Sequence, residues 1–363
     1  MKTPAEIIRR EIGERGVLPF ARFMELALYA PDCGYYEMES GNVGKRGDFY
    51  TSVSVGNLFG ELLAFQFAKW LEELRNAECG VQIIEAGAHD GKLAGNILNW
   101  LQLNRPKLFT QIEYCIIEPS PRRQEWQCET LKQFAPRVRW LSRFDGSAVQ
   151  RFNGIIFSNE LLDAFPVQRF GWDAKNKKWF EWGVAIEGEK FIWAKIQKPQ
   201  SDFPSAICRL PSSLLDVLPD DYTVEISPAA ESWWREAANI LENGKLLTID
   251  YGLTADELIS PARTNGTLRA YSRHHANDDI LANVGEQDLT AHVNFSAIRK
   301  TGEDAGLITE EFCPQAKFLT EILARAAKNN SFGRWDSSDT RQFQTLTHPE
   351  HLGRAFRVLV QSR

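Results

Sequence analysis

Short apolar segments alternate with amphipathic segments through the middle of the chain. The apolar segments are rich in β-branched residues and have the length of strands, whereas the segments between them carry apolar residues at helical spacing. The expected strands are residues 81–84, 113–118, 138–141, 154–158 and 246–250, and the expected helices among them are 93–101, 122–134 and 231–241. Strands that alternate with helices in this way predict an α/β fold with a mostly parallel sheet and helices on both of its faces.

The pattern changes on either side of this alternation. Residues 3–29 and 57–74 have helical apolar spacing and predict a helical amino-terminal region. Tryptophan and phenylalanine alternate with polar residues between 167 and 196, which predicts an antiparallel β insertion between the fourth and fifth strands. Residues 269–295 are polar and predict a long loop, and residues 355–360 predict a final edge or closing strand.

The composition is that of an ordinary globular protein. Of its 363 residues, 43% are hydrophobic and 25% are charged, and no segment is apolar for long enough to span a bilayer. The formal net charge of −6 argues against general binding to a nucleic-acid backbone and favours a basic protein or peptide as partner.

The spacing of cysteines and histidines indicates whether disulfides or a metal site are expected. The six cysteines form no C-x-x-C pair, so we expect free thiols in a reducing compartment. The six histidines have no cysteine or acidic partners at metal-site spacing, so we expect no metal. The first 15 residues mix acidic with basic side chains, unlike a targeting peptide, which predicts a cytoplasmic protein.

A glycine-punctuated turn follows the first expected strand. Glu85 ends the strand, Gly87 and Gly91 permit a tight turn and close approach of the backbone, and a helix follows. This arrangement predicts a nucleotide-like cofactor at the amino terminus of that helix. The dinucleotide fingerprint G-x-G-x-x-G is absent, since His89 stands between the only two glycines, and this argues against a nucleotide-dependent oxidoreductase.

The second expected strand also ends in an acid. Glu118 lies about one βαβ unit after Glu85, where a carboxylate can bind the two hydroxyls of a ribose. In open α/β sheets, ligands bind outside the carboxyl ends of the strands, near the point where the strand order reverses. Polar strand ends also occur where nothing binds, so a purely structural turn is the alternative.

Five ordered motifs carry a family resemblance. Besides the glycine turn, they are the segments at residues 47–52, 158–167, 249–252, and 266–271 with 288–293. With these motifs the chain resembles the MidA-like family from about residue 3 to its end. That family includes a mitochondrial complex I assembly factor with protein arginine methyltransferase activity. Two positions depart from the family pattern, since His89 replaces a glycine and Ser52-Val53-Ser54 replaces a Ser-Pro-acid run.

The resemblance implies a class I methyltransferase fold, which is Rossmann-like, and S-adenosyl-L-methionine as the cofactor. It also implies a division of the chain. Residues 1–75 form a helical region and cofactor-covering loop, and residues 76–363 form the methyltransferase domain. The insertion, at about 164–243, is expected to be a substrate or homodimer region, and a structural lid is the alternative.

A polar loop precedes the glycine turn. The resemblance places Asp48, Thr51 and Ser52 near the methionine end of the cofactor, where Asp48 is expected to hold the ammonium group. The alternative is structural, because Gly47-Asp48 is also an ordinary turn and serine or threonine before a helix is an ordinary cap.

Acids also follow the fourth expected strand. A guanidinium acceptor needs carboxylates to orient it, and bidentate pairing provides that geometry. We therefore expect Glu160 to bind and polarise the acceptor, with Asn159 and Asp163 in support. Capping of a helical turn is the alternative role for Asp163.

His292 is a candidate proton acceptor, because the pKa class of histidine suits proton transfer near neutral pH. A lone histidine is also often structural. Tyr251, which follows the fifth expected strand, is expected to line the acceptor pocket or to pack in the core.

Two other functions stay open for this sequence. One is a catalytically inactive assembly chaperone that keeps the methyltransferase fold, which His89 favours, and the other is a small-molecule methyltransferase. Clustered acids such as Glu85, Glu118, Glu160 and Asp163 favour an enzyme, because clustering them is costly unless they are used. The aromatic insertion and the acidic balance favour the arginine side chain of a protein client as acceptor.

Overall fold

The computed structural model describes residues 3–38, 51–74, 81–144, 152–196, 210–272, 275–328, 331–333 and 335–363. Contacts divide the chain into two compact units. Unit 1 contains Met1–Asn42, Asp163–Glu231 and Leu253–Ser296, and unit 2 contains Val43–Leu162, Ser232–Gly252 and Ala297–Arg363. The functional division at residue 75 into a cofactor-covering region and a methyltransferase domain stays a prediction.

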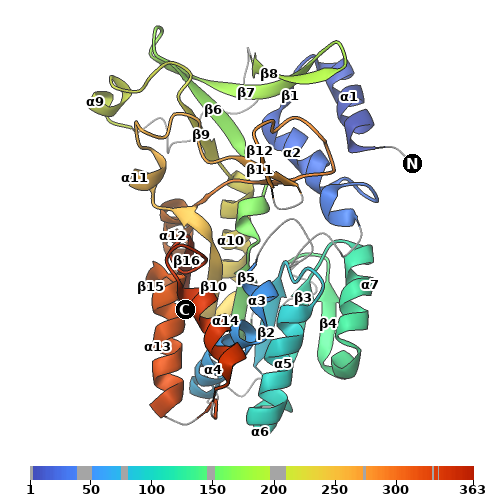
Figure 1. Ribbon diagram of the computed structural model, residues 1–363, viewed down its shortest axis with the longest axis vertical. Coiled ribbons are helices and arrows are strands. Elements are labelled where there is room, and N and C mark those ends of the chain that lie inside the picture. The colour runs from blue at the N-terminus through green and yellow to red at the C-terminus, as the bar shows by residue number, and fades with distance from the viewer. Residues whose placement is uncertain are drawn as a thin grey trace. The chain divides into compact units, whose positions relative to one another are not determined.

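The central sheet of unit 2 is mostly parallel (Figure 1). Its strands include β2 (Gln82–Ala86), β3 (Glu113–Ile117), β4 (Val138–Leu141), β5 (Phe152–Asn159), β10 (Leu241–Leu253), β15 (Ile308–Pro314) and β16 (Phe356–Ser362). They run in the order β15-β16-β10-β5-β2-β3-β4. β2 pairs in parallel with both β3 and β5, so the strand order reverses at β2. The expected α/β class is confirmed.

Helices cover both faces of this sheet. They are α3 (Ser52–Val55), α4 (Leu58–Glu73), α5 (Lys92–Asn104), α6 (Pro106–Phe109), α7 (Pro121–Thr130), α10 (Pro228–Ile240), α12 (Phe295–Asp304), α13 (Gln315–Lys328) and α14 (Ser337–Thr347). Residues of α4, α5 and α13 share one hydrophobic cluster with alternate residues of the strands. On the opposite face Trp234 of α10 donates a hydrogen bond of 2.8 Å to Gln361, which in turn donates to the Arg299 carbonyl of α12.

The last strand, β16, lies inside the sheet. It pairs antiparallel with β10 on one side and with β15 on the other. The expectation of a final edge strand is therefore wrong, and that of a closing strand holds. All the residues of β16 from Phe356 to Gln361 are buried except Arg357, as an interior strand requires.

The expected antiparallel insertion is confirmed in unit 1. Its sheet contains β1 (Leu18–Pro19), β6 (Gln168–Asp173), β7 (Lys178–Glu187), β8 (Lys190–Ile196) and β9 (Thr223–Ile226), in the order β1-β7-β6-β9 with β8 on β7. Every one of these pairings is antiparallel. Trp172 and Trp179 pack across β6 and β7 with ring centroids 5.1 Å apart.

The amino-terminal helical region is broken in two. α1 (Pro4–Arg15) begins with a capping box at Thr3 and ends at Gly16, which has a positive φ of 79°. After β1 the chain continues as α2 (Phe20–Tyr29) and the short helix η1 (Tyr35–Glu37). The helical prediction for residues 3–29 is therefore confirmed in α1 and α2 and is wrong for residues 16–19, because α1 ends at Gly16, whose positive φ does not continue a helix.

The polar segment 269–295 also contains more structure than expected. β11 (Arg269–Ser272) pairs antiparallel with β12 (His275–Asn277) and with β13 (Asp288–Thr290). Unit 1 also contains α9 (Ser212–Leu215), α11 (Ala255–Leu258) and β14 (Val293–Asn294). Within the described ranges, no helix has the length and apolar character needed to cross a membrane.

Candidate active site

The glycine turn between β2 and α5 is built on left-handed backbone. Gly87, His89 and Gly91 have φ values of 75°, 48° and 82°, and Gly91 is the N-cap of α5. A Cβ atom at Gly87 would lie 3.0 Å from Cδ1 of Leu161, so a side chain there meets both strain and a neighbour. Histidine is among the residues that tolerate left-handed backbone better than most, so His89 leaves the turn intact.

Glu85, at the end of β2, is held inside unit 2. Its side chain accepts a hydrogen bond of 2.6 Å from the hydroxyl of Tyr114, and the residue is 2% exposed. Burial raises the pKa of Glu85 to about 7, although the Tyr114 hydrogen bond acts in the opposite direction. The carboxyl group is therefore partly protonated at neutral pH, and its expected role in binding the cofactor stays a prediction.

Glu118 follows β3 and carries the carboxylate expected to bind a ribose. It accepts hydrogen bonds from the backbone N–H of Ser120 at 2.9 Å and from Nε2 of Gln127 at 3.1 Å. Arg123 forms an ion pair with it at 3.0 Å. The side chain is thus fixed at the carboxyl end of β3, beside the strand at which the order reverses.

Gln127 links the two halves of this predicted cofactor site. Besides contacting Glu118, its Nε2 donates a hydrogen bond of 2.9 Å to the carbonyl oxygen of His89 in the glycine turn. Its own Oε1 accepts one from Trp140 at 2.8 Å. Sequence reasoning missed this residue. The only available signal was a polar position on a helix, which is usually exposed to solvent.

Asn159 and Glu160 lie together at the end of β5. Nδ2 of Asn159 and the backbone N–H of Ser52 both donate to Oε1 of Glu160, at 2.9 and 3.2 Å. Glu160 has a φ of 52°, which is strained for a residue other than glycine. The structure therefore brings the predicted cofactor-loop residue Ser52 to the predicted acceptor-binding carboxylate.

The carboxamide oxygen of Asn159 is buried. Its hydrogen bond to Glu160 requires that Nδ2 faces the carboxylate, which fixes the orientation of the amide. Oδ1 is then buried, and among the described residues it has no hydrogen-bond partner. A buried acceptor without a donor is costly, so this atom suits a ligand that supplies N–H groups.

Asp250 anchors the segment that follows Glu160. Oδ2 accepts hydrogen bonds from the backbone N–H groups of Leu161 at 3.1 Å and Leu162 at 2.8 Å, and Oδ1 accepts one from Tyr251 at 2.8 Å. The residue is fully buried. Sequence reasoning included Asp250 only as part of a motif. Its partners are backbone groups, which leave no pattern in the sequence. Tyr251 packs its ring 3.9 Å from that of Phe356.

The residues predicted to lie at the methionine end of the cofactor differ in what the structure shows of them. Thr51 is the N-cap of α3 and forms a capping box with Ser54, so the structural alternative holds for its side chain. The hydroxyl of Ser52 donates to Oε1 of Gln315 at 3.2 Å, while its backbone N–H reaches Glu160. Asp48 lies outside the described residues.

Asp163 and His292 belong to unit 1, whereas Asn159 and Glu160 belong to unit 2. Asp163 is 7% exposed within the short helix η3 (Leu162–Ala164), and its carbonyl accepts a hydrogen bond of 2.9 Å from Ala291. Asp163 is the third residue after Glu160 along the chain.

His292 follows Ala291 and donates its backbone N–H to Oγ1 of Thr267 at 3.1 Å. Burial, together with the positive charges of Arg263 and Arg269, lowers the pKa of His292 to about 4. Its Nδ1 is buried without a hydrogen-bond partner among the described residues. The ring is therefore neutral at pH 7, and it is a weaker base than an ordinary histidine.

The family follows from a comparison with known proteins. A family model described as "Putative S-adenosyl-L-methionine-dependent methyltransferase" matches residues 62–313. The chain belongs to this family. The match spans the glycine turn, Glu118, Glu160 and Asp250, and it confirms the MidA-like resemblance, the methyltransferase activity and S-adenosyl-L-methionine as the cofactor.

Curated relatives of this methyltransferase cover most of the chain. The Drosophila melanogaster protein named "Protein arginine methyltransferase NDUFAF7 homolog, mitochondrial" is 24% identical, over 98% of this chain and 84% of its own. The Bos taurus protein named "Protein arginine methyltransferase NDUFAF7, mitochondrial" is 27% identical, over 96% and 81%. The expected cytoplasmic location is overturned by these comparisons, because the relatives are mitochondrial proteins.

A solved structure agrees over nearly the whole chain. A Burkholderia thailandensis protein crystallised with S-adenosyl-homocysteine is 32% identical, with a TM-score of 0.84, over 99% of this chain and 92% of its own. This likeness confirms the expected class I methyltransferase fold. The residues of this chain also fit such a cofactor, since Gly87 leaves room for close approach and Glu118 ends the neighbouring strand.

Proposed function

We propose that this methyltransferase transfers the methyl group of S-adenosyl-L-methionine to an arginine side chain of a protein client. The observation that carries the proposal is the pair of acceptor groups after β5. The buried Oδ1 of Asn159 lacks a donor among the described residues, and it lies beside the carboxylate of Glu160. A guanidinium has five N–H donors and no acceptor, so it matches this pair. The names of the fly and bovine relatives support the same acceptor.

We assign the cofactor to the carboxyl ends of β2 and β3. The backbone of Gly87 and Gly91 would receive it closely, Glu118 would bind the ribose hydroxyls, and Glu85 would border the turn. Asp48, Thr51 and Ser52 would cover the methionine end. When bound, the cofactor supplies an electrophilic methyl group, so the protein mainly has to position the acceptor and exclude water.

The acceptor must be oriented and must lose a proton. A free guanidinium has a pKa of about 12.5 to 13.8, so it enters the site protonated and attracts carboxylates. Glu160 pairs with it, Asn159 accepts one of its N–H groups, and Asp163 adds a second carboxylate within reach along the chain. The proton released on methylation passes to a nearby carboxylate or to neutral His292 and then to water.

The charge of the chain and its two regions suit a protein client. The net charge of −6 favours a basic segment of the client around the acceptor arginine. Residues 1–75 act as the cofactor-covering region of a methyltransferase domain formed by 76–363. The tryptophan-rich strands β6 to β8 form the surface for the client or for a second copy of the chain.

The test supplies the purified chain with S-adenosyl-L-methionine that carries a tritiated methyl group. The acceptor is total protein from cells of the source organism in which the gene is deleted. Acid hydrolysis and chromatography should recover tritium as methylarginine, and Glu160→Gln should abolish that signal. Tritium in another amino acid, or in small molecules only, would contradict arginine as the acceptor.

A further inference from the structure

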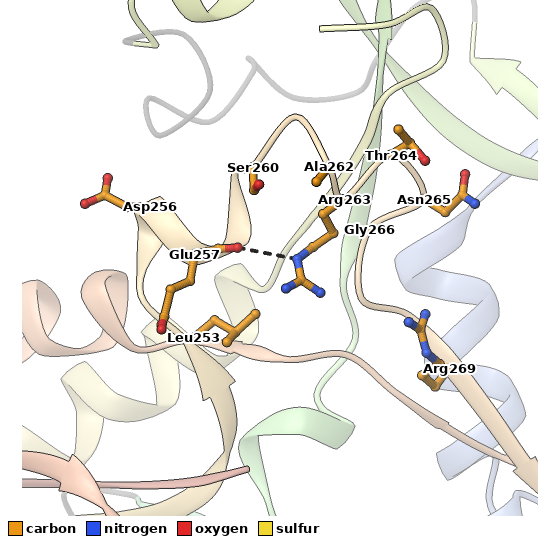
Figure 2. A pocket seen from close by; sticks show the side chains of 10 residues that line it. All are labelled: Leu253, Asp256, Glu257, Ser260, Ala262, Arg263, Thr264, Asn265, Gly266 and Arg269. Carbon is orange, nitrogen blue, oxygen red and sulfur yellow. Dashed lines mark hydrogen bonds between the residues drawn. The ribbon is translucent and has the colours of Figure 1, made fainter. Parts of the chain in front are cut away.

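A polar pocket in unit 1 lies outside the site described above (Figure 2). Its volume is about 560 Å³. The lining residues are Leu253, Asp256, Glu257, Ser260, Ala262, Arg263, Thr264, Asn265, Gly266 and Arg269. Most come from α11 and from the segment that connects it to β11, so one continuous stretch of chain forms the pocket.

Two guanidinium groups of this pocket have no carboxylate partner in the part of the chain that the structure describes. Nε of Arg263 donates to the backbone oxygen of Glu257 at 3.4 Å, as the dashed line in Figure 2 marks. Nη1 of Arg269 donates to the backbone oxygen of Leu268 at 2.8 Å. Across the described part of the chain, neither arginine forms an ion pair. The remaining guanidinium N–H groups are therefore available to an anion.

The buried carboxylate of Glu225 lies next to the pocket wall. Glu225 lies directly behind Gly266, where an added Cβ atom would come within 2.2 Å of its Oε1. Its Oε2 accepts the backbone N–H of Thr267 at 2.7 Å, and Arg169 lies 3.6 Å from Oε1. Glu225 is thus paired with Arg169, and among the described residues it forms no ion pair with Arg263 or Arg269.

The two arginines affect the pKa of His292. Their positive charges add to burial in lowering the pKa of this neighbouring histidine. Arg263 and Arg269 therefore place positive charge beside His292, although the whole chain has a net charge of −6.

We infer that this pocket binds a carboxylate side chain in an acidic segment of the protein client, an inference that rests on the proposed protein substrate. Paired guanidinium groups recognise carboxylates bidentately. A dianionic phosphate suits the pocket less well, because Asp256 and Glu257 also line it and repel the second charge. Ser260, Thr264 and Asn265 add hydroxyl and amide groups that can pair with a peptide backbone.

The test measures binding of a fluorescein-labelled hexaglutamate peptide to the full chain by fluorescence anisotropy. The uncharged hexaglutamine peptide is the matched probe. The double variant Arg263→Gln with Arg269→Gln should weaken hexaglutamate binding by at least about tenfold, as the loss of charge-assisted hydrogen bonds predicts. Arg235→Gln, on an exposed part of α10, should bind as the wild type does.

The outcomes separate the pocket from the proposed function. Equal binding by the wild type and the double variant, or no preference for hexaglutamate over hexaglutamine, would contradict the binding of a carboxylate in this pocket. Stronger binding of inorganic phosphate, measured by its displacement of the peptide, would also overturn the carboxylate assignment. If the chain binds hexaglutamate through these arginines but forms no methylarginine, the pocket binds carboxylates and the proposed arginine acceptor is wrong.

His292 provides a second readout that a merely structural role of the arginines does not give. Its ring protons can be followed by NMR during a pH titration. Hexaglutamate should raise the pKa of His292 in the wild type, because a bound carboxylate offsets the two positive charges. In the double variant the pKa should be raised without the peptide, and adding the peptide should not change it. If adding hexaglutamate does not change the pKa of His292 in the wild type, the proposed carboxylate site is contradicted.

Discussion

The backbone N–H of Ser52 donates a hydrogen bond of 3.2 Å to Oε1 of Glu160, across 108 residues of sequence. Ser52 is the first residue of α3, and Glu160 follows β5 in strained backbone. Asn159 donates to the same oxygen. The carboxylate is therefore held in one orientation by two donors before any substrate arrives, which is the preorganisation that positioning chemistry requires.

Glu160→Gln should separate catalysis from cofactor binding. Glutamine keeps the size of the side chain and an oxygen for Ser52 and Asn159, but it removes the charge that orients a guanidinium. Methyl transfer should fall by about a hundredfold or more, as removal of one electrostatic contact at a reacting centre typically does. Affinity for S-adenosyl-homocysteine should not change. Initial rates of tritium transfer and calorimetry measure the two quantities.

The matched control for that variant is Glu242→Gln, which removes an exposed carboxylate at the start of β10. It should leave both the rate and the affinity as in the wild type. A Glu160→Gln protein that transfers methyl groups at the normal rate would remove Glu160 from the acceptor site.

Asp250→Asn should loosen the segment that follows Glu160. The aspartate accepts three backbone N–H groups, and an asparagine must turn its own N–H₂ toward at least one of them. The free energy of unfolding should fall by about 1 to 3 kcal/mol, the usual cost of a lost buried hydrogen bond. Urea unfolding measures this, and methyl transfer should slow as well.

The control for Asp250 is Asp304→Asn, at an exposed ion pair with Lys300 on α12. Its effect on unfolding should stay below about 0.5 kcal/mol, as for most surface pairs. An Asp250→Asn protein with wild-type stability and rate would show that the three hydrogen bonds do not hold the segment.

Glu85 should make stability depend on pH in an unusual direction. Its pKa is raised from 4.5 to about 7, so between these values the folded chain keeps a proton that the unfolded chain loses. The contribution of Glu85 to stability is therefore complete below pH 4.5 and is lost as the pH rises towards 7. Glu85→Gln should gain stability over the wild type in this window by about 1.4 kcal/mol per pH unit.

Urea unfolding of both proteins at several pH values measures this difference, with Glu242→Gln as the variant that should follow the wild type. A difference between Glu85→Gln and the wild type that does not change between pH 4.5 and 7 would mean that the carboxyl group titrates normally.

The sequence predicted the parallel part of the fold well, because buried parallel strands read as short apolar runs. The expected strand at 138–141 coincides with β4 (Val138–Leu141). The neighbours of a strand are harder to predict. β16 was expected as an edge or closing strand. It is an interior strand because β15 pairs with it, and the consecutive acids Glu310 and Glu311 interrupt the apolar pattern by which β15 could have been predicted.

The site was predictable only where residues carry a recognisable pattern. Gly87 and Glu118 stood out because a glycine turn and an acid after a strand are local signals. Asp250 and Gln127 did not stand out, because Asp250 acts through backbone N–H groups and Gln127 through a backbone carbonyl and distant side chains. The contact between Ser52 and Glu160 depends on the whole fold of unit 2, so spacing in the sequence could not reveal it.

The most direct test of the site is calorimetric titration of the purified chain with S-adenosyl-homocysteine. Gly87→Ala and Glu118→Gln are the site variants. Gly188→Ala is the matched glycine control, since Gly188 also has a positive φ but has open space around it. Micromolar binding by the wild type and the control, weakened at least about tenfold in both site variants, is the predicted result. No binding by the wild type, or equal binding by all four proteins, would contradict the assignment of the cofactor to the ends of β2 and β3.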